Sequence, residues 1–151
     1  MMTQADVAKR TADFRGMCRR QGIKATHQRI AIFLELAGTR EHPNAETVYK
    51  DVRKHMPTIS FDTVYRTLRT FEGRGIIARM GSAGDCMRFD ADTGMHPHFV
   101  CRNCGLMVDL DAAALRHLSP AGISMPGRVD SIHVEFRGLC RKCRRKERSP
   151  R

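Results

Sequence analysis

Residues 60–89 read SFDTVYRTLRTFEGRGIIARMGSAGDCMRF, and this stretch contains the signals that predict the fold of the N-terminal part of the chain. Ser60 is a favourable N-cap, and the apolar residues after it recur at i, i+4 and i+7, which predicts a helix from Phe61 to about Arg74. Two short apolar runs then flank residues 81–85, whose glycines and aspartate favour a turn. The stretch therefore predicts a helix followed by a β-hairpin.

Three more amphipathic helices are predicted before this stretch. The first carries a basic face and is expected to end near Gly22, where glycine favours a C-terminal cap. Thr26 and Asn44 are favourable N-caps for the second and third helices, and Pro57 ends the third. Several short helices followed by a hairpin are typical of a winged helix-turn-helix, a DNA-binding fold.

Beyond residue 90 the periodicity changes to short alternating runs, which predict a separate small α+β unit. Short strands are expected at 98–102 and 106–110, a helix from Asp111 through Leu118, and a longer strand from Val129 to Arg137. The fold class is therefore mainly α with α+β. The predicted boundaries are a winged-helix DNA-binding domain at 1–90, a hinge at 91–95, an α+β metal-binding domain at 96–143 and a basic flexible tail at 144–151.

The formal net charge of the 151-residue chain is +11, and the charge is unevenly distributed. Residues 1–90 contain 16 Lys and Arg against 10 Asp and Glu, and residues 141–151 contain 7 against 1, whereas the segment between them is nearly neutral. A basic N-terminal half and a basic tail favour a polyanionic partner, most simply nucleic acid, over a merely solubilising surface. No segment resembles a signal peptide or a membrane span, so we expect a cytoplasmic protein with reduced thiols.

Two metal-binding patterns meet in HPHFVCRNCG, residues 96–105. The Cys-x-x-Cys spacing of Cys101 and Cys104 recurs at Cys140 and Cys143, which predicts a closed structural zinc site of four thiolates. An iron–sulfur or rubredoxin-like iron site is the alternative. Cys18 and Cys86 have no such partner, and small buried residues are expected there.

The second pattern contains imidazoles and carboxylates. His96 and His98 would share one face of an extended strand, while Asp90 and Asp109 end predicted strands nearby. Nitrogen and oxygen donors without thiolate favour Fe(II), Mn(II) or another borderline divalent ion. The alternative is a pair of surface histidines without a ligand role.

These motifs, in this order, resemble the ferric-uptake-regulator (Fur) family of bacterial metal-dependent transcription factors, and the similarity covers nearly the whole chain. The motifs are Thr26-His27-Gln28-Arg29, His42-Pro43-Asn44-Ala45-Glu46, the helix motif Asp62 to Leu68, Arg88-Phe89-Asp90, His96 to Gly105, Val108-Asp109, and Cys140-x-x-Cys143.

The resemblance implies a homodimer that binds double-stranded operator DNA when a regulatory metal is bound, with dimerisation through the C-terminal domain. It also implies one ligand that spacing alone does not select, His42. The implied regulatory site consists of His42, Asp90, His96, His98 and Asp109. Filling it would fix the orientation of the two winged helices, so that they match half-sites about one DNA turn apart.

Within the family, the chain resembles the peroxide-responsive, PerR-like repressors. Asp109 stands where iron-responsive members more often carry Glu, and Asp90 where zinc-responsive members often carry Cys. The resemblance implies that Fe(II) would react with hydrogen peroxide and that oxygen would be inserted into His42 or His96. The alternative is an iron-responsive repressor, and a zinc- or manganese-responsive regulator ranks below it.

The predicted DNA contacts lie on the helix that follows Ser60 and on the first helix. Tyr65 and Arg66 are expected at base edges, and Arg69, Arg19 and Arg20 at phosphates. Thr63 shares the polar side of the later helix. His133 stands one residue from the position at which some family members recruit a histidine for an additional metal site, so strand parity would direct it to the opposite face, and we leave it out of the ligand set.

Two other functional classes are less consistent with the sequence. A metal-dependent hydrolase or oxygenase would need a substrate pocket with a general acid or base, and it would not explain a basic winged helix. A zinc-stabilised adaptor that does not bind DNA would not use His42 or the arginines of the helix after Ser60. We therefore expect a regulator that is not an enzyme, with no small-molecule substrate other than metal and hydrogen peroxide.

Overall fold

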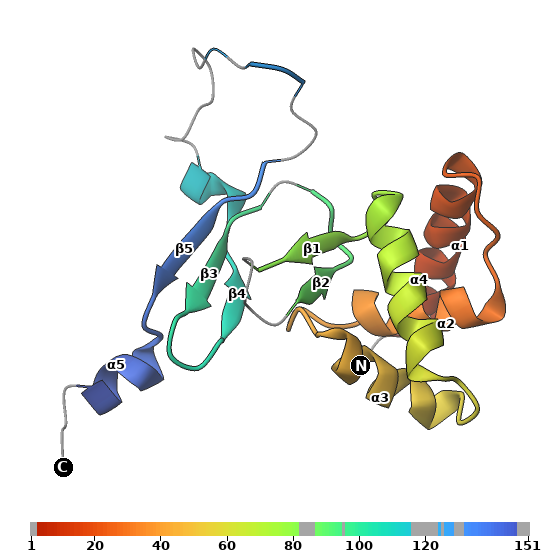
Figure 1. Cartoon of the computed structure of the whole chain (residues 1–151), viewed down its shortest axis with the longest axis horizontal. Coiled ribbons are helices and arrows are strands. Elements are labelled where there is room, and N and C mark those ends of the chain that lie inside the picture. The colour runs from red at the N-terminus through yellow and green to blue at the C-terminus, as the bar shows by residue number, and fades with distance from the viewer. Residues whose placement is uncertain are drawn as a thin grey trace. The chain divides into compact units, whose positions relative to one another are not determined.

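The computed structural model describes residues 3–81, 87–94, 96–115, 124, 126–128 and 132–147, and Figure 1 shows the helices and strands they form. The chain divides into two compact units, one ending at Thr93 and the other beginning at Gly94. The boundary lies within the segment expected to be a hinge. Met95, Cys86 and the turn around it fall outside the described residues.

Four helices form most of the N-terminal unit, as the sequence predicts. They are α1 (Gln4–Arg20), α2 (His27–Ala37), α3 (Ala45–His55) and α4 (Phe61–Gly73). The expected caps are confirmed at Thr26, Asn44 and Ser60, because each side chain accepts a hydrogen bond from the backbone N–H three residues later. Gly22 has a φ of 66°, a left-handed conformation in which glycine is favoured and which lets the chain turn after α1.

The core of this unit is built around aromatic side chains from three helices. Phe14 of α1 stacks on Phe33 of α2, with ring centroids 4.5 Å apart, and meets Phe71 of α4 edge to face at 5.3 Å. Phe14 and Phe71 are completely buried. Burial of these large apolar surfaces holds α4 against the other helices and fixes which of its faces remains at the surface.

The hairpin predicted after α4 is present as β1 (Ala78–Met80) and β2 (Arg88–Asp90). The two strands are antiparallel, and Arg79 lies opposite Phe89. Phe89 is fully buried in the core, so the hairpin packs against the helices. Helices followed by this wing confirm the winged helix-turn-helix.

The C-terminal unit contains a three-stranded sheet of order β4-β3-β5. Strand β3 (His98–Cys101) pairs antiparallel with β4 (Met107–Asp109) and parallel with β5 (Glu135–Gly138). A short 3-10 turn, η1 (Ala112–Leu115), follows β4, and α5 (Arg141–Glu147) follows β5. This α+β architecture matches the predicted class.

Two local expectations need correction or lie partly outside the described residues. Where a helix from Asp111 to Leu118 was expected, the structure describes a 3-10 turn up to Leu115, and residues 116–120 are outside the description. The last strand begins at Glu135, and residues 129–131 are likewise outside. Among the helices of the described residues, none is long and apolar enough to cross a membrane.

The tail expected to be flexible from residue 144 is helical as far as Glu147. The prediction was wrong for residues 144–147 because charge alone does not reveal that α5 is anchored at its start. Cys143 is buried, and the backbone N–H of Arg144 donates to the carbonyl of Cys140 at 2.9 Å. Residues 148–151 lie outside the description.

Candidate metal centres and nucleic-acid face

The four cysteines of the two Cys-x-x-Cys pairs come together in the C-terminal unit. Cys101 ends β3, Cys104 follows in a turn, Cys140 precedes α5, and Cys143 lies in its first turn. Their sulfur atoms all lie within 4.8 Å of one another, and all except Cys104 are buried. Gly105, with a φ of 69°, lets the turn fold back so that its N–H reaches the Cys101 carbonyl at 2.9 Å.

Hydrogen bonds and burial shift the proton affinities of these thiols. The backbone N–H of Cys140 donates to Sγ of Cys101 at 3.3 Å, and such bonds lower the pKa of Cys101 to about 6. A hydrogen bond with the Asn103 side chain lowers the pKa of Cys143, but burial and the neighbouring sulfurs outweigh it and raise that pKa to about 11. Four close sulfurs favour a divalent cation that neutralises them, so the donor set fits zinc.

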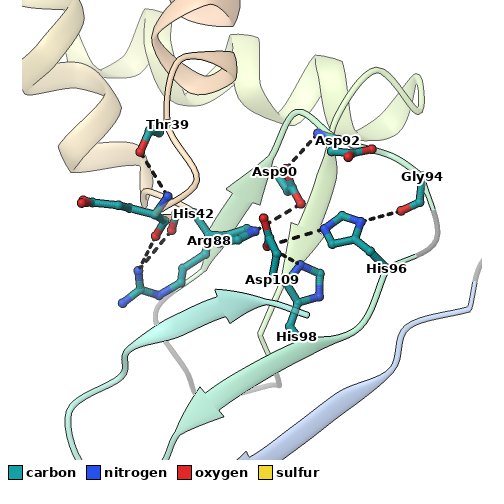
Figure 2. A network of polar contacts seen from close by, with 10 residues as sticks. Thr39, His42, Arg88, Asp90, Asp92, Gly94, His96, His98 and Asp109 are labelled. Atoms are coloured by element: carbon teal, nitrogen blue, oxygen red, sulfur yellow. Dashed lines mark hydrogen bonds and ion pairs between the residues drawn. The ribbon is translucent and has the colours of Figure 1, made fainter. Parts of the chain in front are cut away.

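In the N-terminal unit, His42 pairs with Asp90. The imidazole Nε2 lies 3.2 Å from the Asp90 carboxylate, and only 2% of the His42 side chain is exposed. His42 precedes α3, while Asp90 ends β2, so the pair joins residues 48 positions apart. The other Asp90 oxygen accepts a hydrogen bond from the N–H of Asp92 at 2.8 Å, which fixes the carboxylate (Figure 2).

In the C-terminal unit, His96, His98 and Asp109 form a second cluster. His98 and Asp109 are directly opposite each other on β3 and β4, with His98 Nε2 3.4 Å from the carboxylate. Nε2 of His96 is 3.7 Å from the same oxygen, so both imidazoles face Asp109, although His96 lies before β3 and not within a strand (Figure 2).

The backbone orients the His96 ring. Its Nδ1 lies 2.8 Å from the carbonyl oxygen of Gly94. Because a carbonyl oxygen can only accept, Nδ1 is the donor, and in the neutral ring the lone pair then resides on Nε2, the nitrogen that faces Asp109. Imidazole nitrogens and carboxylate oxygens fit Fe(II) or Mn(II) by their donor chemistry.

The predicted DNA-contacting side chains have unequal surroundings on α4. Arg66 is highly exposed, with its guanidinium 3.6 Å from the Asp62 carboxylate, and Tyr65 is also exposed. Arg69 instead pairs with Glu72. Thr63 takes part in the N-terminal cap, where its backbone N–H and hydroxyl contact Ser60.

Other side chains of the N-terminal unit are also exposed. Arg19 and Arg20 are exposed in the last turn of α1. Phe61, which the sequence reasoning did not select, is 42% exposed and stacks beside Tyr65 at a centroid distance of 6.2 Å. An exposed aromatic residue at the start of a helix predicted to contact DNA could have signalled it.

Two residues singled out in the sequence lie outside the candidate clusters. Cys18 is buried in the N-terminal core, and burial raises the pKa of its thiol, as suits an inert small residue. His133 is exposed and lies before β5. The structure places neither residue in a candidate metal cluster of the described residues.

Residues 20–125 match the sequence profile of the Ferric uptake regulator family, which is more than half of the chain. The chain belongs to the Ferric uptake regulator family. The matched segment contains the five predicted imidazole and carboxylate ligands as well as Cys101 and Cys104, whereas Cys140 and Cys143 lie beyond it. The resemblance inferred from the motifs is thus confirmed.

Several proteins similar to this chain are peroxide regulators. The peroxide operon regulator of Bacillus subtilis (strain 168) is 33% identical over 127 residues, which is 83% of this chain and 88% of that protein. Among solved structures, the Campylobacter jejuni peroxide stress regulator aligns with a TM-score of 0.62 at 26% identity, covering 94% of this chain and 100% of that one. The Helicobacter pylori ferric uptake regulator aligns with a TM-score of 0.73 at 19% identity, covering 95% and 97%, which supports the fold.

Proposed function

We propose that the chain is a metal-dependent transcriptional repressor that senses peroxide and binds operator DNA as a homodimer. Family membership and the fold support the DNA-binding regulator. The similarity to a peroxide operon regulator over most of both chains supports the peroxide response. The observation that carries the proposal is that His42 and Asp90 in one unit, and His96, His98 and Asp109 in the other, present only imidazole and carboxylate donors.

In this proposal the two clusters are halves of one regulatory site that holds Fe(II) or Mn(II). One half belongs to the winged-helix unit and the other to the α+β unit, so an ion bound by both halves would couple their orientations. The orientation of the winged helices in a dimer then decides whether two half-sites on DNA are contacted together. Loss of the ion would release this constraint and weaken operator binding.

The four thiolates of Cys101, Cys104, Cys140 and Cys143 are proposed to hold structural zinc. A closed tetrahedral site of this kind contributes folding free energy rather than reactivity, because all coordination positions are taken by the protein. The site would attach α5 to the end of β3. The regulatory ion and the structural ion therefore have separate roles.

Peroxide sensing would consist of a single oxygen transfer to His42 or His96. Bound iron supplies the redox chemistry that activates hydrogen peroxide. In the net reaction, a ring C–H of the imidazole becomes C–OH, which rearranges to the oxo form; the ring loses two electrons, peroxide accepts them, and one water molecule leaves. The oxidised ring is a poorer nitrogen donor, so the site loses affinity for its ion.

The decisive experiment measures operator binding by zinc-loaded protein that contains Fe(II) or Mn(II), before and after hydrogen peroxide. Peptide mass spectrometry then locates any added oxygen. We expect loss of binding only in the iron form, with one oxygen on His42 or His96. An iron form that stays unmodified and bound to DNA after peroxide contradicts peroxide sensing and favours an iron-responsive repressor. Operator affinity that does not depend on Fe(II) or Mn(II) contradicts metal-dependent regulation.

A further inference from the structure

We propose that Arg88 is a positioning residue of the regulatory site, which holds the backbone of His42 so that its imidazole faces Asp90 before an ion binds. This inference rests on the proposed function, because it takes His42 and Asp90 to be ligands. Arg88 lies in β2, two residues before Asp90. Because Arg88 and His42 are far apart in the sequence, no local spacing predicts that they are in contact.

The side chain of Arg88 contacts the two backbone carbonyls that flank the His42 α-carbon. Its Nη1 donates to the carbonyl oxygen of Glu41 at 3.3 Å and to that of His42 at 3.1 Å. A guanidinium group that bridges two successive carbonyls restrains both peptide planes. Figure 2 shows this contact beside the His42–Asp90 pair.

The main chain of β2 reinforces the same loop. The backbone N–H of Phe89 donates to the carbonyl of Pro43 at 3.1 Å, and Asn44 and Arg88 form an isolated antiparallel bridge. Asp90 continues this strand, so the element that restrains the loop also carries the second ligand. Arg88 is therefore connected to Asp90 through the backbone and to His42 through its side chain.

The His42 backbone needs such restraint. Its φ is 49°, and among the described residues it is the one non-glycine residue with a positive φ. L-amino acids adopt this left-handed region at a steric cost, and they persist there only when the surrounding structure determines the conformation. Without the two hydrogen bonds from Arg88, the loop would relax and carry the imidazole away from Asp90.

A purely electrostatic role for Arg88 predicts the opposite result. The guanidinium is positively charged, and a nearby positive charge opposes the binding of a divalent cation. Removing the charge alone should therefore strengthen Mn(II) binding. If Arg88 positions His42, removing it should weaken Mn(II) binding, so the sign of the change distinguishes the two roles.

The test uses the full-length, zinc-loaded protein, with Mn(II) affinity measured by electron paramagnetic resonance of unbound Mn(II). We expect Arg88→Met to weaken binding by about 10- to 100-fold, the range typical for loss of a group that orients a metal ligand. Arg79→Met is the matched control, because Arg79 lies opposite Phe89 on the adjacent strand and pairs with Glu72. Affinity that is unchanged or stronger in Arg88→Met overturns the proposal.

A double-mutant cycle shows whether Arg88 acts through His42. His42→Ala should itself weaken Mn(II) binding, and Arg88→Met should then cause no further loss. An equal further loss in the His42→Ala background overturns the positioning role. If His42→Ala leaves the affinity unchanged, the proposed ligand set is wrong, an outcome distinct from failure of Arg88 alone.

A conservative variant covers the case in which Arg88→Met does not fold. Arg88→Lys keeps the charge but is shorter and lacks the planar guanidinium, so it should also weaken Mn(II) binding. After Fe(II) and peroxide, its share of added oxygen on His42 relative to His96 should also fall. Wild-type affinity together with a wild-type oxygen distribution overturns the proposal.

Discussion

At the residue scale, the arginines of α4 differ in how readily they can reach DNA. Arg66 pairs with the exposed Asp62 carboxylate at 3.6 Å, and exposed ion pairs of this kind are weak. Arg69 contacts Glu72, which is also 3.4 Å from Arg79 in β1. We therefore expect Arg66 to exchange its partner for a base edge more easily than Arg69.

Replacing Arg66 and Arg19 should have different effects on DNA binding. Arg66→Ala should lower discrimination between operator and altered sequences by about 1–3 kcal/mol, the usual contribution of an arginine–base contact. Arg19→Ala should weaken binding to all sequences and flatten its salt dependence, because a phosphate contact carries no sequence information. Affinity measurements against operator and scrambled DNA at several salt concentrations test this; the same uniform loss in both variants contradicts the assigned roles.

At the element scale, α4 is defined by interactions at its ends and along one face. The Ser60 hydroxyl accepts a hydrogen bond from the Thr63 N–H at 3.1 Å and satisfies a donor that has no partner within the helix. Val64, Leu68 and Phe71 are completely buried. The cap fixes where the helix begins, and the buried face fixes which side chains remain available for DNA.

Removing this cap should destabilise the N-terminal unit without altering its core. Ser60→Ala is expected to lower the free energy of unfolding by about 1 kcal/mol, because the Thr63 N–H loses its acceptor. Ser60→Asp serves as the control, since aspartate is also a good N-cap. Urea unfolding monitored by far-ultraviolet circular dichroism measures both; equal stability of Ser60→Ala and the wild type would show that the cap contributes nothing.

Deleting a central aromatic side chain should have a larger effect. Phe14→Ala removes the ring that contacts both Phe33 and Phe71, and it is expected to cost about 3–5 kcal/mol through lost burial and a remaining cavity. Phe61→Ala is the matched control, because that ring is 42% exposed. Thermal or urea unfolding separates them, and a similar loss in both variants contradicts the assignment of Phe14 to the core.

At the scale of the whole molecule, the two units are stabilised in different ways. Among the described residues of the N-terminal unit, fifteen are buried in one continuous apolar core. In the described part of the C-terminal unit, the buried cluster is Cys101, Cys140 and Cys143, with Phe99 and Leu139 packed against it. Zinc held by the four sulfurs, as we propose, would add metal–ligand bonds to this small described cluster and contribute to the stability of the unit.

Loss of one thiolate should therefore affect the two units unequally. Cys143→Ser is expected to reduce zinc content and to remove cooperative unfolding of the C-terminal unit, while the helices of the N-terminal unit persist. Cys18→Ala is the control that should keep its zinc, since Cys18 lies in the N-terminal core. Zinc analysis and amide hydrogen exchange resolved by peptide measure this; full zinc occupancy in Cys143→Ser contradicts a four-sulfur site.

The elements and the ligand types follow from the sequence because they depend on interactions between residues close in the chain. Helix caps at Thr26, Asn44 and Ser60 act over three residues, and the apolar spacing of α4 repeats within one helix. Each Cys-x-x-Cys pair is likewise local. The prediction of a flexible tail failed for residues 144–147. The high charge of this segment favoured flexibility, but the segment continues a short helix that is anchored by the buried Cys143.

Tertiary structure decides the contacts between distant residues. The pairing of His42 with Asp90, the restraint of His42 by Arg88 and the parallel alignment of β3 with β5 each join segments more than thirty residues apart. No local preference encodes such contacts, since they form only when burial of the cores brings the segments together. Local sequence patterns therefore predict the candidate metal ligands and DNA contacts, whereas folding decides which of these side chains meet and places Arg88 against the His42 backbone.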